Sequence, residues 1–241
     1  DFANAVAIQA DGKIVVGGYT QNGSITEAII ARLNTDGSLD ASFDNDGIKV
    51  ISTGNNYDQI NDIKIQTDGK IIACGQNATI GSSLDFMTIR LNSDGTFDTS
   101  FNSSGIVLTN FSTTDEIAKC LYIQSDNKIL VGGYASTVIS GSTSNNYAIL
   151  RYNTDGTLDN TFSGDGQFVI GYNTQSDILN SISISGSRIY LGGYTYVNSS
   201  NINDFFIVAI TASGCENILW SWEYKKTKNT LLSMEKNLSI K

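Results

Sequence analysis

Two short blocks of sequence recur along the chain, and this repetition constrains the fold more than any other feature. The first block reads IQADGKIVVGGY where it first occurs, and its copies begin at four isoleucines: Ile8, Ile65, Ile123 and, in a more divergent copy, Ile184. The second block reads RLNTDGSLDASF, and its copies begin at three arginines: Arg32, Arg90 and Arg151. Successive copies lie 57 to 61 residues apart. Self-similarity at a fixed period of this size indicates a repeat architecture.

Each block predicts a β-hairpin. Apolar residues at alternate positions flank Ala10-Asp11-Gly12, a three-residue loop whose glycine suits a left-handed conformation, and Thr35-Asp36-Gly37 repeats this chemistry. The fourth copy has a shorter loop, in which Gly186-Ser187 predicts a two-residue type II′ turn. Two hairpins supply about four strands per repeat, and either Ser38–Phe43 or Ile48–Ser52 could be the fourth.

A repeat of about 60 residues buries too little surface to be stable alone, so neighbouring sheets are expected to stack face to face. The sequence therefore predicts an all-β fold, a β-propeller of four roughly four-stranded antiparallel blades. Four blades are at the lower limit for a closed ring, which makes an open or partial propeller the alternative. The expected units are residues 1–57, 58–115, 116–176 and 177–214.

Residues 215–241 depart from the repeat and are expected to form a divergent tail or cap. Within this segment the apolar residues Leu231, Leu232, Met234 and Leu238 could line a short amphipathic helix. A cap or frayed tail is the simpler interpretation, because the segment carries no copy of either block.

The segments DGKIVVGG from Asp11 and RLNTDGSLDASFDNDG from Arg32 resemble the delta-60 repeat, a family of tandem modules in large bacterial surface and secreted proteins. The resemblance covers roughly residues 1–214 and implies propeller blades and an extracellular or cell-surface location. It brings no established catalytic residues. In the unit of that family the opening DFAN belongs in the middle, so further repeats are expected upstream.

Composition excludes several classes of function. The chain has no histidine, so it lacks Ser-His-Asp and Cys-His catalytic units and histidine-ligated zinc. Its 15 Lys and Arg are outnumbered by 24 Asp and Glu, which argues against nucleic-acid and anionic-membrane partners. No run approaches the roughly 18 apolar residues of a membrane span, so no membrane insertion is expected. The cysteines Cys74, Cys120 and Cys215 form no CxxC pair and are expected to be free thiols.

The arginine and aspartate of the second block predict structural ion pairs rather than catalytic groups. A three-residue loop places Arg32 opposite Asp40, and the same register gives the pairs Arg90 with Asp98 and Arg151 with Asp159. In the fourth copy both positions change together, to Ala209 and Asn217. Joint loss of both members is what a structural pair predicts.

A candidate binding site lies at the end of the blades opposite the Asp-Gly turns. We call this end the rim. The first and third strands of a meander start at the same end, where the second strand finishes. The residues before each first strand are all acidic: Asp1, Asp58, Glu116 and Asp177. The residues before each third strand are Glu27, Asp85, Asn146 and Asp204, and those ending each second strand are Tyr19, Gln76, Tyr134 and Tyr194. We expect a rim of carboxylates and tyrosines; the simpler alternative is solvated acids beside tyrosines that pack between blades.

These observations favour a non-enzymatic interaction or scaffold module that binds a protein or carbohydrate ligand at the rim. A carbohydrate-active enzyme, such as a glycoside hydrolase or lyase, is the alternative if two rim carboxylates act as acid and base. A calcium-stabilised module is a third hypothesis, because Asn34-x-Asp36-Gly37 and Asp44-x-Asp46-Gly47 resemble part of an EF-hand loop. Both segments lack the remaining ligands, so turn formation explains them better and no cofactor is expected.

Overall fold

Every regular element of the described chain is a β-strand. The computed structural model describes residues 1–54, 57–78, 82–112, 114–139, 142–172, 176–197, 202–225, 230–231 and 238–240. Within these ranges no helix has the length and apolarity needed to cross a membrane.

The strands form four antiparallel meanders, which are the blades. Blade 1 contains β1 (Phe2–Ile8), β2 (Ile14–Asn22), β3 (Ile25–Leu33) and β4 (Ile48–Ile51). Blade 2 contains β5 (Tyr57–Ile65), β6 (Ile71–Ala78), β7 (Asp85–Leu91) and β8 (Ile106–Thr109). Blade 3 contains β9 (Glu116–Ile123), β10 (Ile129–Ile139), β11 (Ser142–Tyr152) and β12 (Gln167–Tyr172). Blade 4 contains β13 (Asp177–Ser185), β14 (Arg188–Val197), β15 (Ile202–Thr211) and β16 (Gly214–Lys225).

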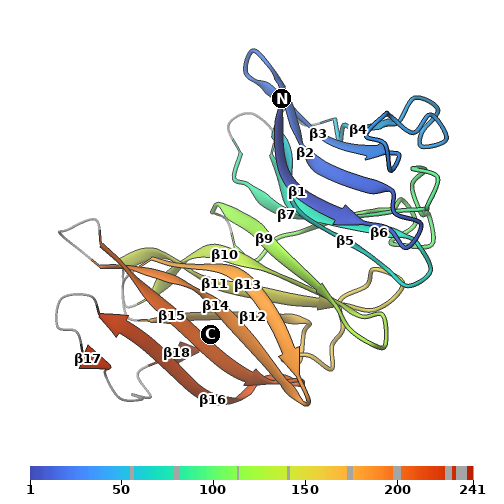
Figure 1. The fold of residues 1–241 in the computed structure, drawn as a ribbon. Coiled ribbons are helices and arrows are strands. Elements are labelled where there is room, and N and C mark those ends of the chain that lie inside the picture. Colours follow the sequence, from blue (N-terminus) through green and yellow to red (C-terminus); the bar gives the residue numbers. More distant parts are fainter. Residues whose placement is uncertain are drawn as a thin grey trace.

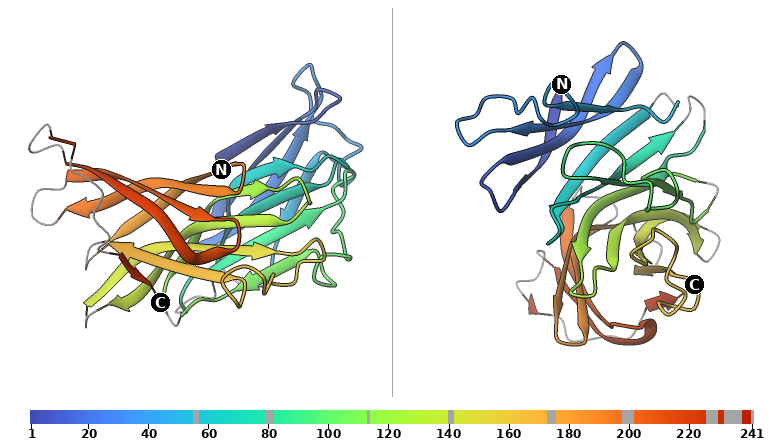
Figure 2. Two further views of the ribbon diagram at one scale, coloured as in Figure 1. Left: turned by 90° about the horizontal axis from the view of Figure 1, so that it is seen from below. Right: turned by 90° about the vertical axis from the view of Figure 1, so that its right-hand side faces the viewer.

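The blades stack in chain order as an open fan, with blades 1 and 4 at its ends (Figures 1 and 2). The sheets of the described residues do not close into a ring; the one strand pairing that joins two blades is a parallel bridge between Thr26 and Tyr57. This arrangement confirms the predicted all-β propeller in its partial form.

The fourth strand of each of the first three blades comes from the second of the two candidate segments. In blade 1 it is β4, which pairs with β3, whereas Ser38–Phe43 makes a tight return through a bridge between Leu33 and Leu39. The return is closed by a hydrogen bond from the Phe43 amide to the Asp40 carbonyl, 2.9 Å long. Because Ser38–Phe43 is not a strand of the sheet, its side chains can contact the next blade.

The C-terminal segment differs from the expected tail. β16 pairs with β15 along most of its length and completes blade 4, so the blade continues past the boundary predicted at residue 214. Two short strands follow: β17 (Thr230–Leu231) pairs with β16, and β18 (Leu238–Ile240) pairs with β12 of blade 3. Leu231 and Leu238, the first and last residues of the proposed amphipathic helix, therefore lie in β-strands. Residues 232–237 between them lie outside the described chain.

Three apolar clusters form the core, one at each junction between neighbouring blades. Val15 and Ile30 of blade 1 pack with Ile60 and Ile63 of blade 2, and the equivalent clusters lie between blades 2 and 3 and between blades 3 and 4. Each blade therefore obtains its core from its neighbours, as expected for a repeat too small to be stable alone.

The paired glycines of the first block are explained by close packing. Every first strand of a blade carries a bulge, at which the second glycine faces a backbone carbonyl. A Cβ atom at Gly18 would lie 1.8 Å from the Phe2 carbonyl oxygen, and one at Gly17 would lie 2.2 Å from Cδ1 of Ile63 in blade 2. Neither position has space for a larger side chain.

Candidate functional site

The charged residues of the second block form a buried network at the turn end of the blades, where the Asp-Gly loops lie. Arg32 Nε lies 2.6 Å from Asp40 Oδ2, and equal distances join Arg90 with Asp98 and Arg151 with Asp159. Each guanidinium carbon lies 4.6 to 4.9 Å from the centre of a phenylalanine ring: Phe43, Phe101 and Phe162. All six charged residues are buried.

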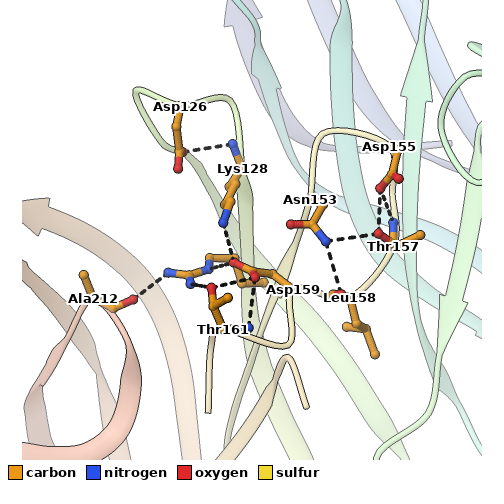
Figure 3. Close-up of polar contacts among 10 residues, drawn as sticks. Asp126, Lys128, Asn153, Asp155, Thr157, Leu158, Asp159, Thr161 and Ala212 are labelled. Carbon is orange, nitrogen blue, oxygen red and sulfur yellow. Dashed lines mark hydrogen bonds and ion pairs between the residues drawn. The ribbon is translucent and has the colours of Figure 1, made fainter. Parts of the chain in front are cut away.

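Each carboxylate has a second cationic partner that the sequence analysis missed. Lys13 Nζ lies 2.8 Å from Asp40 Oδ2, and Lys70 and Lys128 occupy the same position beside Asp98 and Asp159. Figure 3 shows the third copy, in which Lys128 and Thr161 converge on Asp159. The recurrence of this lysine two residues after the turn aspartate, as DGK in the first two copies and DNK in the third, was the available signal.

The network connects each blade to the next. In the second copy Arg90 Nη1 donates to the Thr154 carbonyl of blade 3 at 2.6 Å, and in the third Arg151 Nη1 donates to the Ala212 carbonyl of blade 4 at 2.5 Å (Figure 3). Arg32 makes the same contact with the Ser93 carbonyl of blade 2. These residues are therefore structural connectors between blades.

The surroundings of the turn-end aspartates favour the charged forms of their carboxyl groups. Lys13 and Ser42 hold the pKa of Asp40 well below its usual range. At Asp98 burial acts in the opposite direction, but Lys70, Ser100 and Arg90 together still hold the pKa well below that range.

At the rim the structure differs from the predicted ring of exposed carboxylates. Asp58, Glu116 and Asp177 have no exposed surface, and only Asp1 of this set is exposed. Asp58 Oδ2 accepts a 3.0 Å hydrogen bond from the Thr53 amide, and Glu116 Oε2 accepts one of 2.7 Å from the Phe111 amide. Both donors belong to the connection from the preceding blade, so these carboxylates anchor crossovers and are not presented to a ligand.

Burial has a clear consequence at Glu116. Removal from water raises the pKa of this carboxyl to about 6, against the lowering effect of the hydrogen bonds that it accepts from Phe111 and Ser112. No cation is among the groups that shift it, in contrast to the aspartates of the turn end.

The third-strand set is mixed in its exposure. Glu27 and Asp85 are half-buried, whereas Asn146 and Asp204 are buried. Asp85 Oδ1 accepts a 2.8 Å hydrogen bond from Asn110 Nδ2. These groups lie at the predicted end of their blades, but they do not form a continuous exposed surface.

The aromatic part of the predicted rim is present on blades 3 and 4. Tyr134 and Tyr194 are half-buried, and Tyr196 is 44% exposed, with its ring centre 5.3 Å from that of Tyr194. Burial raises the pKa of Tyr194 to about 12, and the Tyr196 hydroxyl adds to the rise. Burial also raises the pKa of Tyr134, with smaller effects from Asp115 and Tyr196. We call Tyr134, Tyr194 and Tyr196 the tyrosine cluster.

Tyr196 was missed by the sequence analysis, although it follows Tyr194 by two residues and therefore shares its face of the strand. The other two rim positions are used differently. Tyr19 stacks on Phe2 with a centroid distance of 4.7 Å, and Gln76 is buried and donates to Gln59 Oε1 at 2.9 Å.

The Asp-Gly loops use their carboxylates within their own turns. Asp36 Oδ1 accepts from the amide and hydroxyl of Ser38 at 2.9 and 2.6 Å, and Asp46 Oδ1 accepts from the Ile48 amide at 2.9 Å. Within the described residues, no group of three or more Asp, Glu or Cys is placed to hold a metal ion. Cys74 and Cys120 are buried free thiols whose pKa is raised by burial, and the side chain of Cys215 lies outside the described residues.

Comparison with known proteins bears on the repeated blocks. Residues 9–43, 66–101 and 124–162 match the profile of a family described as a domain of unknown function (DUF5122) beta-propeller. The chain contains β-propeller repeats. Each matched segment contains one arginine–aspartate pair of the turn end, so the profile covers the residues that connect the blades of this propeller.

Solved structures of similar shape have low sequence identity. They include an endo-arabinase from Bacteroides thetaiotaomicron, with a TM-score of 0.47, 9% identity and coverage of 86% of this chain and 74% of that one. A Cellvibrio cellulosa alpha-L-arabinanase complexed with arabinohexaose has a TM-score of 0.41 and 11% identity over 85% of this chain and 72% of that one. The native Bacillus subtilis arabinanase has a TM-score of 0.41 and 10% identity over 95% and 74%. A search of curated proteins finds no match.

Proposed function

We propose that this propeller is a non-enzymatic, extracytoplasmic interaction module that binds a protein or carbohydrate ligand through the tyrosine cluster. The observation that carries the proposal is the contact of Tyr194 with the partly exposed Tyr196 on blade 4, whose ring centres lie 5.3 Å apart. Tyr134 of blade 3 occupies the position equivalent to Tyr194 at the same rim, and Tyr196 contributes to the rise of its pKa. Tyrosine rings offer a flat apolar face together with a hydroxyl, which suits both sugar rings and peptide side chains. The partly exposed Tyr196 is the group most accessible to such a ligand.

The burial of the rim carboxylates argues against catalysis. A glycosidase needs two carboxyl groups that both reach the scissile bond. Here Asp58 and Glu116 are fully buried and each anchors a different crossover between blades. A carbohydrate-active enzyme is the second candidate, favoured by one observation: the pKa of Glu116, raised to about 6 by burial, is in the range of a general acid.

The experiment that tests the proposal screens the chain against panels of glycans and peptides and compares Tyr196→Ala with Tyr57→Ala. Tyr57, on blade 2, has a similar exposure of 39% and provides a matched control. We expect Tyr196→Ala to weaken binding about tenfold or more, since losing one well-placed aromatic contact costs roughly 1–3 kcal/mol. Equal binding by both variants would contradict the proposal.

The same glycans, followed for release of reducing ends, test the second candidate. We expect no turnover. Turnover that disappears in Glu116→Gln, while the variant unfolds at an unchanged or higher temperature, would favour the enzyme instead.

A further inference from the structure

A cleft of about 380 Å³ lies on blade 3, beside the connection that arrives from blade 2. Three segments line it: this connection, the end of β10 and the turn into β12. We call it the hydroxyl cleft, and its lining includes Phe111, Ser112, Thr114, Thr137, Asp165 and Gln167. None of the three tyrosines of the tyrosine cluster lines it, so it is a second candidate site on this molecule.

The wall formed by the connection is held in place from both blades. The Phe111 ring packs edge-on against Phe86 of blade 2, with 5.1 Å between the ring centres. Thr114 Oγ1 donates a hydrogen bond to the Ser136 carbonyl of β10, and Ser112 Oγ lies 2.9 Å from Thr114 Oγ1. Because these contacts fix the wall before any ligand arrives, the ordering cost of binding is lowered.

The other polar groups of the hydroxyl cleft are available to a ligand. Among the hydrogen bonds of the described residues, none involves the side-chain amide of Gln167. Asp165 Oδ1 accepts from the Gln167 backbone amide at 2.9 Å, but no described donor bonds to its Oδ2. Thr137 Oγ1 accepts from Asn146 Nδ2 at 2.7 Å, which leaves its hydroxyl hydrogen for an outside acceptor.

Two buried acceptors next to the cleft lack donors. Within the described residues, Glu116 Oε1 and Asn146 Oδ1 have no hydrogen-bond partner, and neither residue has exposed surface. Glu116 is in contact with the cleft because its Oε2 accepts from the Phe111 amide. Asn146 is in contact with it through Thr137. Acceptors therefore outnumber donors around the cleft.

Blade 2 satisfies the equivalent carboxylate internally. Asn77 lies opposite Asp58 in the strand pairing, as Ala135 lies opposite Glu116 in blade 3. The Asn77 amide donates to Asp58 Oδ1 and, at 2.6 Å, to Thr53 Oγ1. An alanine cannot donate, so the donor is missing in the blade that carries the cleft.

We propose that the hydroxyl cleft is a binding site for a neutral mono- or disaccharide. Each sugar hydroxyl both donates and accepts a hydrogen bond. Its hydrogens suit Asp165 Oδ2 and, through water, the buried acceptors, while its oxygens suit the Gln167 amide and the Thr137 hydroxyl. Phe111 supplies apolar surface for the C–H groups of the ring. The cleft volume is at the small end of the range for small-molecule sites, roughly 300–1,000 Å³.

Other classes of ligand fit this cleft less well. An ammonium group has no acceptor for the hydrogens that Gln167 and Thr137 offer. An anionic ligand would lie beside the carboxylate of Asp165. An extended peptide binds through the backbone groups of a free strand edge, whereas the available polar groups here belong to side chains.

Calorimetry of the full chain with a panel of neutral mono- and disaccharides tests the proposal. We expect a member of the panel to bind, and Asp165→Asn to weaken its binding about tenfold or more, because the substitution removes a charged acceptor. Asp46→Asn is the matched control, since Asp46 makes the same turn in blade 1, outside the cleft, and accepts from the Ile48 amide at 2.9 Å. Binding by no member of the panel, or equal weakening by the two substitutions, would overturn the proposal.

Ala135→Asn tests the part played by the buried acceptors. It places the amide donor of blade 2 at the equivalent position of blade 3, so these acceptors no longer draw on the ligand and its waters. We expect the affinity for the saccharide to fall, with thermal unfolding confirming that the variant is folded. An affinity equal to that of the parent chain in a folded variant would contradict this part of the proposal.

The tyrosine cluster is separated from the hydroxyl cleft by one further comparison. Tyr196→Ala should leave binding at the cleft unchanged, because Tyr196 does not line it. Saccharide binding that is lost in Tyr196→Ala but kept in Asp165→Asn would overturn the proposal and assign the ligand to the tyrosine cluster. The two sites can therefore fail independently.

Discussion

The turn end and the rim bury carboxylates in opposite ways. At the turn end Asp98 lies between Arg90 and Lys70, and its pKa is held far below the usual range. At the rim Glu116 accepts hydrogen bonds from neutral groups, and burial raises its pKa to about 6. The same residue class thus connects blades as an ion pair at one end and anchors a crossover at the other. The comparison shows that repetition of an acid along the chain does not reveal its role.

The largest effect on stability is expected when Asp98 loses its buried partner Arg90. Arg90→Ala should lower the free energy of unfolding by about 3–5 kcal/mol, because it leaves the buried Asp98 with only the partly exposed Lys70 as a cationic partner and removes the contact with the Thr154 carbonyl. Urea unfolding at neutral pH measures the change.

Lys64→Ala is the control for this prediction. Lys64 pairs with Asp62 but keeps 47% of its side chain exposed, so its removal should cost less than about 1 kcal/mol. Similar losses in both variants would show that the turn-end network is no stronger than a surface ion pair.

An intermediate effect is expected at the rim, and it depends on pH. Since the folded pKa of Glu116 lies near 6, above its usual value of 4.5, the folded protein binds the proton more tightly than the unfolded chain and loses stability as pH rises through this range. The loss amounts to about 2 kcal/mol. Glu116→Gln removes this pH-dependent loss. Between pH 4 and pH 7 the free energy of unfolding of the variant should therefore rise relative to that of the parent chain by about this amount. Unfolding at several pH values measures the difference, and parallel profiles would contradict the prediction.

The smallest effect is expected from removing Lys70, the more exposed of the two cationic partners of Asp98. Lys70 is 29% exposed, so Lys70→Ala should cost about 1 kcal/mol or less at neutral pH. Because Lys70 helps to depress the pKa of Asp98, the variant should also lose stability at a higher pH on acidification. Acid titrations of the two proteins by circular dichroism would test this, and coincident curves would assign the depression to Arg90 and Ser100 alone.

The register of the hairpin was sufficient to predict the arginine–aspartate pairs from the sequence. Arg32 and Asp40 lie eight positions apart around one tight return, so hairpin geometry brings them together whatever the rest of the molecule does. Lys13 reaches the same carboxylate from a different hairpin, which requires the second strand to lie beside the third. Register alone therefore predicts the pairing, whereas the third member also requires the packing of two hairpins; the recurrence of its lysine was the one sequence signal for it.

The expected exposure of the rim carboxylates was wrong for a related reason. Chain direction correctly places Asp58 and Glu116 at the same end of their blades, but their burial depends on the crossover from the preceding blade. No local pattern shows that Thr53 and Phe111 turn their amides toward these side chains.

The sequence by itself determined the repeat, the hairpins, their turns and the apolar alternation of each strand, because these depend on contacts between residues close in the chain. Tertiary structure alone decided which of the equivalent positions are covered. Val6 and Ile63 have the same pattern around them, yet one is exposed and the other has no exposed surface, since burial belongs to the junction between two sheets and not to either sheet alone.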